Sequence, residues 1–116
     1  MSAGVREKPA VAELRDRVEL RTRVETDEDE GGRSALYVSL ATVWARVTTL
    51  TPRIVSSADG RAVTVTHSVV LRWRTDISLG DRLVFAGRSL EVIGAEDLNG
   101  RRTYLSLACS EVRMVG

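Results

Sequence analysis

The residues best suited to catalysis are few in this chain, which has one histidine, His67, and one cysteine, Cys109. A catalytic triad would place His67 beside a nucleophile, and the sequence indicates no such partner for it. His67 alternates with Val65 and Val69, so we expect its imidazole to be buried or half-buried and hydrogen-bonded. Cys109 is expected to be a small buried hydrophobe, and a single cysteine excludes an internal disulfide. The sequence therefore predicts that the protein is not an enzyme.

Metal and phosphate sites are not expected either. One histidine and one cysteine cannot supply the three or four nitrogen and sulfur ligands of a structural zinc site. The acidic run Asp27–Glu30 lacks the alternating ligand spacing and the distal glutamate of a calcium loop. Gly31-Gly32 and Gly87 are too few and too widely spaced to form a phosphate-binding loop. We accordingly expect no cofactor and no metal.

Tryptophan and arginine are the remaining side chains with the chemistry of a binding surface. Trp73 is expected in the core, whereas Trp44 can lie in the core or in an interface, because aromatic side chains provide the largest burial per residue. Arg72 and Arg74 lie on the opposite strand face from Trp73, where they can meet water, a neighbouring protein or a phosphate. The candidate interface residues are Arg15, Arg17, Trp44, Arg46, Arg72 and Arg74.

The charges of the chain nearly cancel, since 17 basic and 16 acidic side chains give a net charge of +1. Proteins that bind nucleic acid through its phosphates usually carry a strongly basic balance. We therefore expect no tight, salt-dependent binding of DNA by the monomer. No apolar run approaches the roughly 18 residues of a membrane span, and residues 1–12 lack the apolar core of a signal peptide. These features predict a soluble protein that stays in the cytoplasm where it is made.

Alternation of apolar and polar residues, which is the period of a half-buried strand, recurs along the chain. It begins at Val18–Val24 and is longest at Val63–Arg74. The segment Ala35–Leu50 is also predicted to be a strand, with a register break or short turn near Ser39–Ala41. Helix is the competing interpretation of that segment, and its β-branched residues disfavour it. Residues 51–61 contain Pro52, two serines, Asp59 and Gly60, and are predicted to form an exposed loop.

Two hairpins are predicted in the second half of the chain. One joins Leu83–Phe85 to Leu90–Ile93 through Ala86-Gly87. The other turns at Asn99-Gly100, the dipeptide that most favours a type I′ turn because both central residues need positive φ. At 116 residues the chain has room for one core. We predict a mainly β fold: a small antiparallel β-barrel or sandwich over residues 14–116, with a long inter-strand loop and an extended, flexible N-terminal arm at residues 1–13.

Five of these elements, taken in order, resemble the phage head-tail joining (head-tail adaptor, or head-closure) proteins. The family opens on a Leu-Arg-x-Arg-Val/Ile element and continues with Trp-Ala-x-Val, Thr-His and Phe/Tyr-x-Gly-Arg elements before a last Arg-x-Tyr-Leu strand. The matching segments here are Leu14–Leu20, Val43–Val47, Thr66–Arg74, Arg82–Arg88 and Arg102–Val112. The loop after Val47 departs from the family pattern, because Thr51–Val55 replaces its usual Gly-x-Glu element and helical residues.

The resemblance implies a structural subunit of the head-tail connector: a head-closure (stopper) or joining ring that retains DNA and docks the tail. The implied ring is a homo-oligomer, a hexamer being favoured and a dodecamer possible, in the neck of a virion assembled in the host cytoplasm. A portal-adaptor ring would lie above it, a tail terminator ring below it, and double-stranded DNA would pass through its lumen without sequence specificity. The candidate gate or vertical-contact loop consists of Thr51, Pro52, Arg53, Ile54, Val55, Ser56, Ser57, Ala58, Asp59 and Gly60.

A second hypothesis is a stand-alone small β-barrel that binds nucleic acid or peptide. Such a module needs exposed stacking aromatic residues and a basic groove. The chain has five aromatic residues, mostly patterned inward, and balanced charge. A gel-shift assay distinguishes the two hypotheses, because tight binding by the monomer would favour the module.

Overall fold

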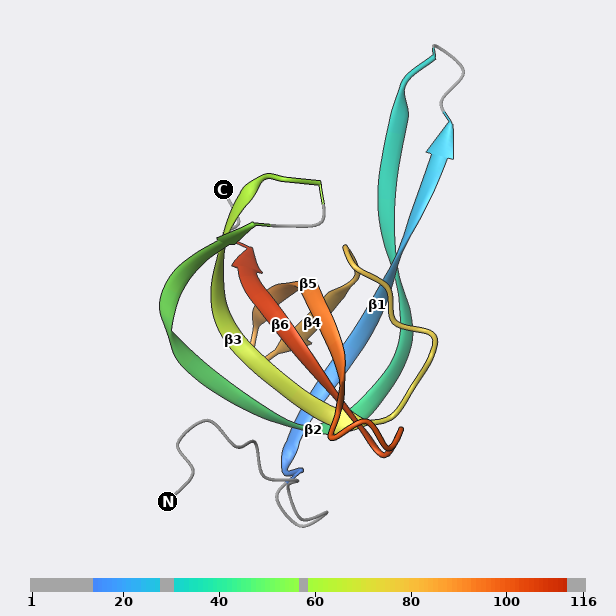
Figure 1. The fold of residues 1–116 in the computed structure, drawn as a ribbon. Helices are drawn as coiled ribbons and strands as arrows, with labels where there is room; N and C mark the ends of the chain where they lie inside the picture. Colours follow the sequence, from blue (N-terminus) through green and yellow to red (C-terminus); the bar gives the residue numbers. More distant parts are fainter. Residues whose placement is uncertain (1–13, 28–30, 57–58, 113–116) are drawn as a thin grey trace.

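The computed structural model describes residues 14–27, 31–56 and 59–112, which form one antiparallel β-barrel (Figure 1). The order of strands around the barrel is β1-β2-β3-β6-β5-β4, and every neighbouring pair is antiparallel. This arrangement confirms the predicted fold class. Over the same residues the structure has no helix of the length and hydrophobicity that a membrane crossing requires. The strands are β1 (Asp16–Asp27), β2 (Arg33–Ser56), β3 (Ala62–Arg72), β4 (Arg82–Phe85), β5 (Arg88–Leu98) and β6 (Tyr104–Val112).

The barrel is filled by aliphatic side chains from all six strands. Alternate residues of β3 point inward from Val65 to Leu71, as the sequence pattern predicts. His67 belongs to this inward row, is 4% exposed, and its Nδ1 lies 2.8 Å from the Thr66 hydroxyl. The expectation of a buried, hydrogen-bonded imidazole is therefore confirmed. The main cluster consists of Val18, Leu20, Ala45, Val69, Leu71, Leu83, Leu90, Val92, Leu105, Leu107 and Cys109.

Strands β1 and β2 continue beyond the barrel as a two-stranded ribbon, which Figure 1 shows projecting at the upper right. We call residues 22–27 and 33–38 the β1–β2 ribbon; within the described residues they pair only with each other. A β-bulge at Leu40 separates the ribbon from the barrel, because Leu20 pairs with Ala41 and Arg21 pairs with Ser39. The register break predicted near Ser39–Ala41 is confirmed, and the competing helix is wrong.

The predicted loop at residues 51–61 is wrong in its extent. Residues 51–56 continue β2 and pair with β3 through Arg53↔Val65 and Ser56↔Ala62. An irregularity between Thr49 and Arg53 absorbs Pro52, which has no backbone N–H to donate and is tolerated at bulges. We call residues 49–56 and 59–65 the β2–β3 hairpin; it projects from the same end of the barrel as the β1–β2 ribbon (Figure 1). Ser57 and Ala58 lie outside the described residues, as do the predicted arm at 1–13 and Glu28–Glu30.

The two hairpin turns predicted downstream are present, with one difference. Ala86 and Gly87 form a two-residue turn between the paired Phe85 and Arg88, and both have positive φ, as a type I′ turn requires. Asn99 and Gly100 also have positive φ, of 64° and 68°. Their connection is longer than a two-residue turn, however, since β5 ends at Leu98 and β6 begins at Tyr104. The Asp97 carboxylate accepts hydrogen bonds from the Arg102 backbone N–H and stabilises this longer loop.

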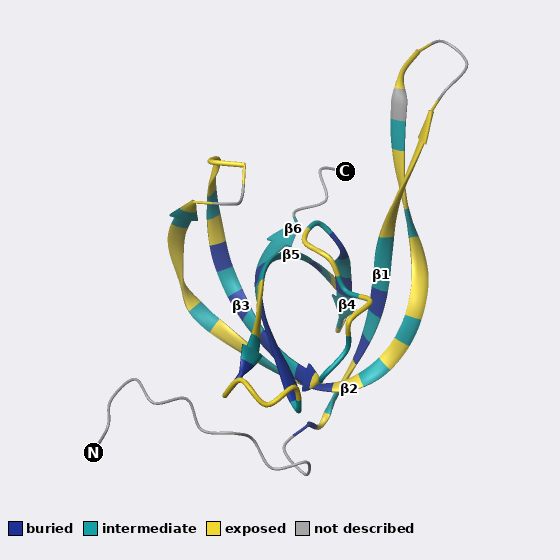
Figure 2. Ribbon diagram, turned by 45° about the vertical axis from the view of Figure 1, so that its right-hand side comes forward, coloured by how far each residue is buried: buried dark blue, intermediate teal, exposed yellow. Residues whose placement is uncertain are grey.

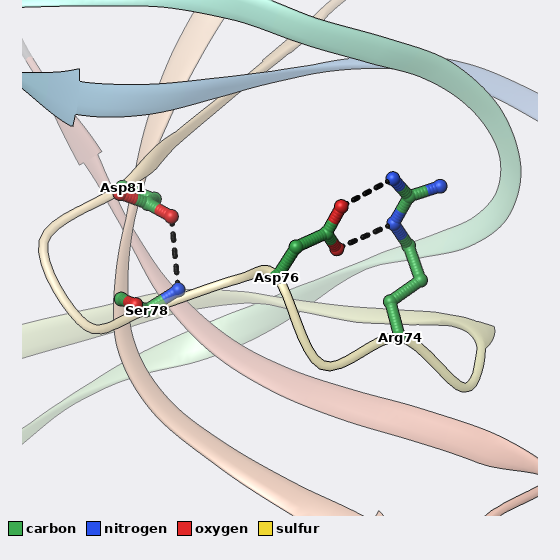
Figure 3. Close-up of polar contacts among 4 residues, drawn as sticks. All are labelled: Arg74, Asp76, Ser78 and Asp81. Carbon is green, nitrogen blue, oxygen red and sulfur yellow. Dashed lines mark hydrogen bonds and ion pairs between the residues drawn. The ribbon is translucent and has the colours of Figure 1, made fainter.

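The crossover at residues 73–81 connects β3 to β4 and ends on a buried carboxylate. Asp81 is 5% exposed and accepts hydrogen bonds from the Ser78 N–H at 2.9 Å (Figure 3), the Arg23 N–H at 3.0 Å and the Thr22 hydroxyl at 3.3 Å. These bonds connect the crossover to β1 at the base of the β1–β2 ribbon. Trp73 and Ile77 pack against the core from the same segment, as predicted for Trp73.

Candidate assembly surfaces

An apolar groove lies at the end of the barrel opposite the two projecting hairpins, where β1 begins and β3 ends. It has a volume of about 790 Å³ and is open to solvent. Two tryptophans, Trp44 and Trp73, form much of its wall, and three arginines contribute to its lining. We call this feature the lower groove, lined by Leu14, Arg15, Val43, Trp44, Leu71, Arg72, Trp73 and Arg74.

The structure brings most of the predicted interface residues to this groove. Arg15, Trp44, Arg72 and Arg74 line it, and Trp44 is 52% exposed, so it is not a core residue. The Arg17 guanidinium stacks over the Trp44 ring at 4.7 Å from its centroid, which fixes the orientation of both side chains. Arg46 is exposed on β2 opposite Val70 and does not line the groove.

Arg74 is held in place by Asp76 in the crossover. Its Nε donates to Oδ1 at 2.9 Å and its Nη2 donates to Oδ2 at 2.8 Å (Figure 3). The hydrogen bonds from Arg74 lower the pKa of Asp76, and they also raise the pKa of Arg74. Both groups are therefore charged at neutral pH, and the groove presents a guanidinium of fixed orientation.

The β2–β3 hairpin carries the candidate gate residues at an exposed position. Ile54 is 75% exposed, the highest value among the large hydrophobic residues described as exposed. Thr51, Pro52, Arg53, Ser56 and Gly60 are also exposed, and Val55 is partly buried. Near the tip, the Arg61 Nε forms an ion pair with Asp59 Oδ2 at 2.8 Å. Asp59 and Arg61 line a cleft with Leu79 and Gly80 of the crossover, so the tip lies close to the barrel.

The β1–β2 ribbon exposes an apolar face that the sequence-based list of sites missed. Val24 pairs with Leu36, and Thr22 pairs with Val38, so all four lie on one face. Leu36 is 60% exposed and Val38 is 50% exposed, and Figure 2 shows exposed residues along both strands of the ribbon. Burial of Leu36 or of Val38 by a partner would contribute a binding free energy on the order of 1 kcal/mol per side chain, about half the value for full burial. The sequence shows that these apolar residues alternate with polar ones. Only the pairing of the strands shows that β3 to β6 do not cover the apolar face of the ribbon.

The described residues hold no cluster of three or more histidine, cysteine or acidic side chains that could bind a metal ion. Burial raises the pKa of the Cys109 thiol to about 12, which keeps it protonated and unreactive.

The sequence matches the phage head completion protein family over residues 10–112. The chain belongs to this family. That membership confirms the resemblance found in the sequence and identifies a structural protein of the phage virion that acts in completion of the head. No curated protein matches the sequence.

Two solved structures are similar to this family member. One is a protein from Shigella flexneri 2a, known from its solution structure; it is 27% identical, with a TM-score of 0.64 over 87% of this chain and 95% of that one. The other is a chain of the virion of a native gene transfer agent particle, 19% identical, with a TM-score of 0.61. This second match covers 83% of the present chain and 93% of the virion chain. At that identity it supports the fold alone.

Proposed function

We propose that this head completion protein is a subunit of a homo-oligomeric ring in the neck of the virion, at the junction of head and tail. The ring acts as a stopper or joining ring that retains packaged DNA and provides the docking surface for the tail. Family membership over residues 10–112 carries the proposal. The barrel with two projecting hairpins supports it, because exposed apolar surface on a small domain commonly marks an assembly contact.

The neighbours proposed for this ring are a portal-adaptor ring above and a tail terminator ring below. Double-stranded DNA passes through the lumen without sequence specificity. The net charge of +1 is in keeping with a conduit, because a wall with many arginine-phosphate pairs would hold the duplex in place. The number of subunits is six, with twelve as the alternative, and the protein assembles in the host cytoplasm.

The β2–β3 hairpin is proposed as the gate or vertical contact. Its exposed Ile54 and Ser56 can enter the lumen or meet an adjacent ring. We also propose that the arm from Val5 toward Leu14, which lies outside the described residues as far as residue 13, lies on a neighbouring subunit after assembly, whereas Leu14 itself is buried in its own subunit. Protease sensitivity of that segment should then fall between the free protein and the particle.

The direct test of this function is removal of the gene from the phage or gene transfer agent that carries it. We expect heads that package DNA but fail to retain it, and tails that remain unattached. Supply of the wild-type chain should restore intact particles. Normal yields of tailed, DNA-filled particles without the protein would rule the function out.

A second candidate function, a stand-alone nucleic-acid or peptide-binding barrel, is favoured by one observation. The lower groove combines two tryptophans with three arginines, side-chain types that bind single-stranded nucleic acid by stacking and charge. A gel-shift assay of the purified protein at moderate salt tests this alternative. We expect no shift of single- or double-stranded DNA, and a tight complex would favour the module over the ring subunit.

A further inference from the structure

We propose that the lower groove of one subunit receives the apolar face of the β1–β2 ribbon of a second copy of this chain. This inference rests on the proposed ring and specifies which two surfaces hold it together. Two features of the structure carry it: a ribbon with no covering partner at one end of the barrel, and an open apolar groove at the other.

The ribbon is the part of the fold that most needs a partner. An isolated two-stranded ribbon is at best marginally stable in water, because it has no second layer to cover its apolar face. Here Val24, Leu36 and Val38 form such a face, and each is 42% exposed or more. The same row of β1 enters the barrel at Leu20, which is 2% exposed. The ribbon therefore extends the core-facing side of the sheet beyond the core that would cover it.

The groove offers matching surface at the opposite end. Its wall consists of Leu14, Val43, Trp44 and Trp73, which are apolar, and its volume of about 790 Å³ lies within the roughly 300–1,000 Å³ of pockets that bury whole ligands. Several aliphatic side chains can enter a space of this size. The Trp44 ring is already oriented by Arg17, so little ordering is needed when a partner binds.

Charge distinguishes this pairing from contact between two ribbons. The sequence from Thr22 to Val38 has five acidic residues, of which Glu28–Glu30 lie outside the described residues, and two arginines, so its net charge is −3. Arginines 15, 72 and 74 line the groove, and Asp76 pairs with Arg74, so the net charge there is +2. Two such segments repel each other through their net charges, whereas the segment and the groove attract each other.

The geometry of the pairing requires a second subunit. Leu36 and Trp44 are eight residues apart on one strand, which at 3.3 Å per residue separates them by roughly 26 Å. A subunit therefore cannot place its own ribbon in its own groove. Contacts between two different surfaces are heterologous, and they generate a ring when the rotation between subunits closes.

Cysteine cross-linking in assembled particles tests the contact. A Leu36→Cys/Arg72→Cys variant places one thiol on the ribbon and one at the groove, both at exposed positions where folding is tolerated. Cys109 is buried and does not compete for the reagent. With a bifunctional maleimide we expect a ladder of covalent oligomers that ends at the ring size, and no ladder from either single variant.

The matched control is Leu36→Cys/Arg88→Cys, because Arg88 is exposed but lies outside the groove. A ladder from this control and none from the groove pair would overturn the inference, as would dimers from Leu36→Cys alone. Absence of cross-links in particles that contain the protein would also overturn it while leaving the proposed ring intact. Absence of the protein from purified particles, measured by immunoblotting, would instead refute the proposed function.

Discussion

Asp81 connects segments of the fold that are distant in the sequence. Its carboxylate is almost fully buried and accepts hydrogen bonds from two backbone N–H groups and one hydroxyl. Two of the donors belong to Thr22 and Arg23, which are distant in the sequence. Loss of the carboxylate leaves buried donors without an acceptor, and this costs more than the hydrogen bonds themselves contribute.

We therefore predict that Asp81→Ala lowers the free energy of unfolding by about 2–4 kcal/mol. Asp76→Ala is the matched control, since it removes a bidentate ion pair with Arg74 at an exposed position and should cost less than about 1 kcal/mol. Urea denaturation followed by tryptophan fluorescence measures both. Equal effects of the two substitutions would contradict the role assigned to Asp81.

Cys109 gives a second prediction at this scale. Burial raises its pKa to about 12, so the folded protein should not react with a thiol reagent at pH 8 except through unfolding. The pKa of Cys109 in the folded protein lies above its ordinary value of 9.0, so the thiol does not reduce the free energy of unfolding below about pH 9. The free energy of unfolding should fall as the pH rises from 9 toward 12, because the unfolded chain loses the thiol proton there and the folded chain retains it. Rapid stoichiometric labelling without denaturant would show that the thiol is accessible.

The sequence predicted the conformation and contacts of some residues but not of others. The positive φ of Asn99 and Gly100 was predictable, because the requirement is local to the dipeptide. Asp81 was not, because its hydrogen-bond donors on β1 are 58 and 59 residues away in the chain. The lower groove falls between these cases: its arginines and Trp44 were selected from the sequence, but only the barrel brings them together.

The alternation of apolar and polar residues predicted the strands, but it did not predict where β2 ends. Pro52 and the serines after it are typical of loops, yet residues 51–56 remain in β2. The irregularity between Thr49 and Arg53 places Pro52 where no ladder hydrogen bond is required of it, and pairing with β3 resumes at Arg53. The candidate gate is therefore the end of a hairpin supported by strands, with only its tip irregular.

We predict that Ile54→Asp impairs DNA retention or tail attachment without unfolding the protein. Ile54 is 75% exposed, so the substitution should change the free energy of unfolding by less than about 0.5 kcal/mol. Arg101→Asp, at an exposed position on the β5–β6 loop, is the control and should leave particles normal. Particle titre and packaged DNA are the measurements. Normal values for both in the Ile54 variant would exclude the hairpin as the gate.

At the scale of the whole molecule, the closed barrel fixes the directions in which the three surfaces face. The β1–β2 ribbon and the β2–β3 hairpin project from one end (Figure 1). The residues that line the lower groove lie at the other end, where β1 begins and β3 ends. The fold class was predictable from a series of short antiparallel strands. The pairing of β1 with β4, which closes the barrel, was not, because nothing local to either strand specifies a partner more than 60 residues away.

This arrangement places three separate exposed surfaces on one small, nearly neutral chain. One pair of surfaces, ribbon and groove, can connect neighbouring subunits, while the β2–β3 hairpin remains available to the lumen or to an adjacent ring. Under the proposed function each surface has a separate role, so variants of the ribbon and of the hairpin should have different defects. Ribbon variants should fail to assemble, and hairpin variants should assemble but lose DNA or tails.

We propose that the protein forms a ring in the neck of the particle. Electron cryo-microscopy of intact particles, with the chain located by its barrel and two hairpins, measures this most directly. We predict a closed ring of six or twelve copies between head and tail, with the β2–β3 hairpins toward the lumen or an adjacent ring. Density for the chain in the capsid shell or the tail tube, or its absence from the neck, would contradict the account.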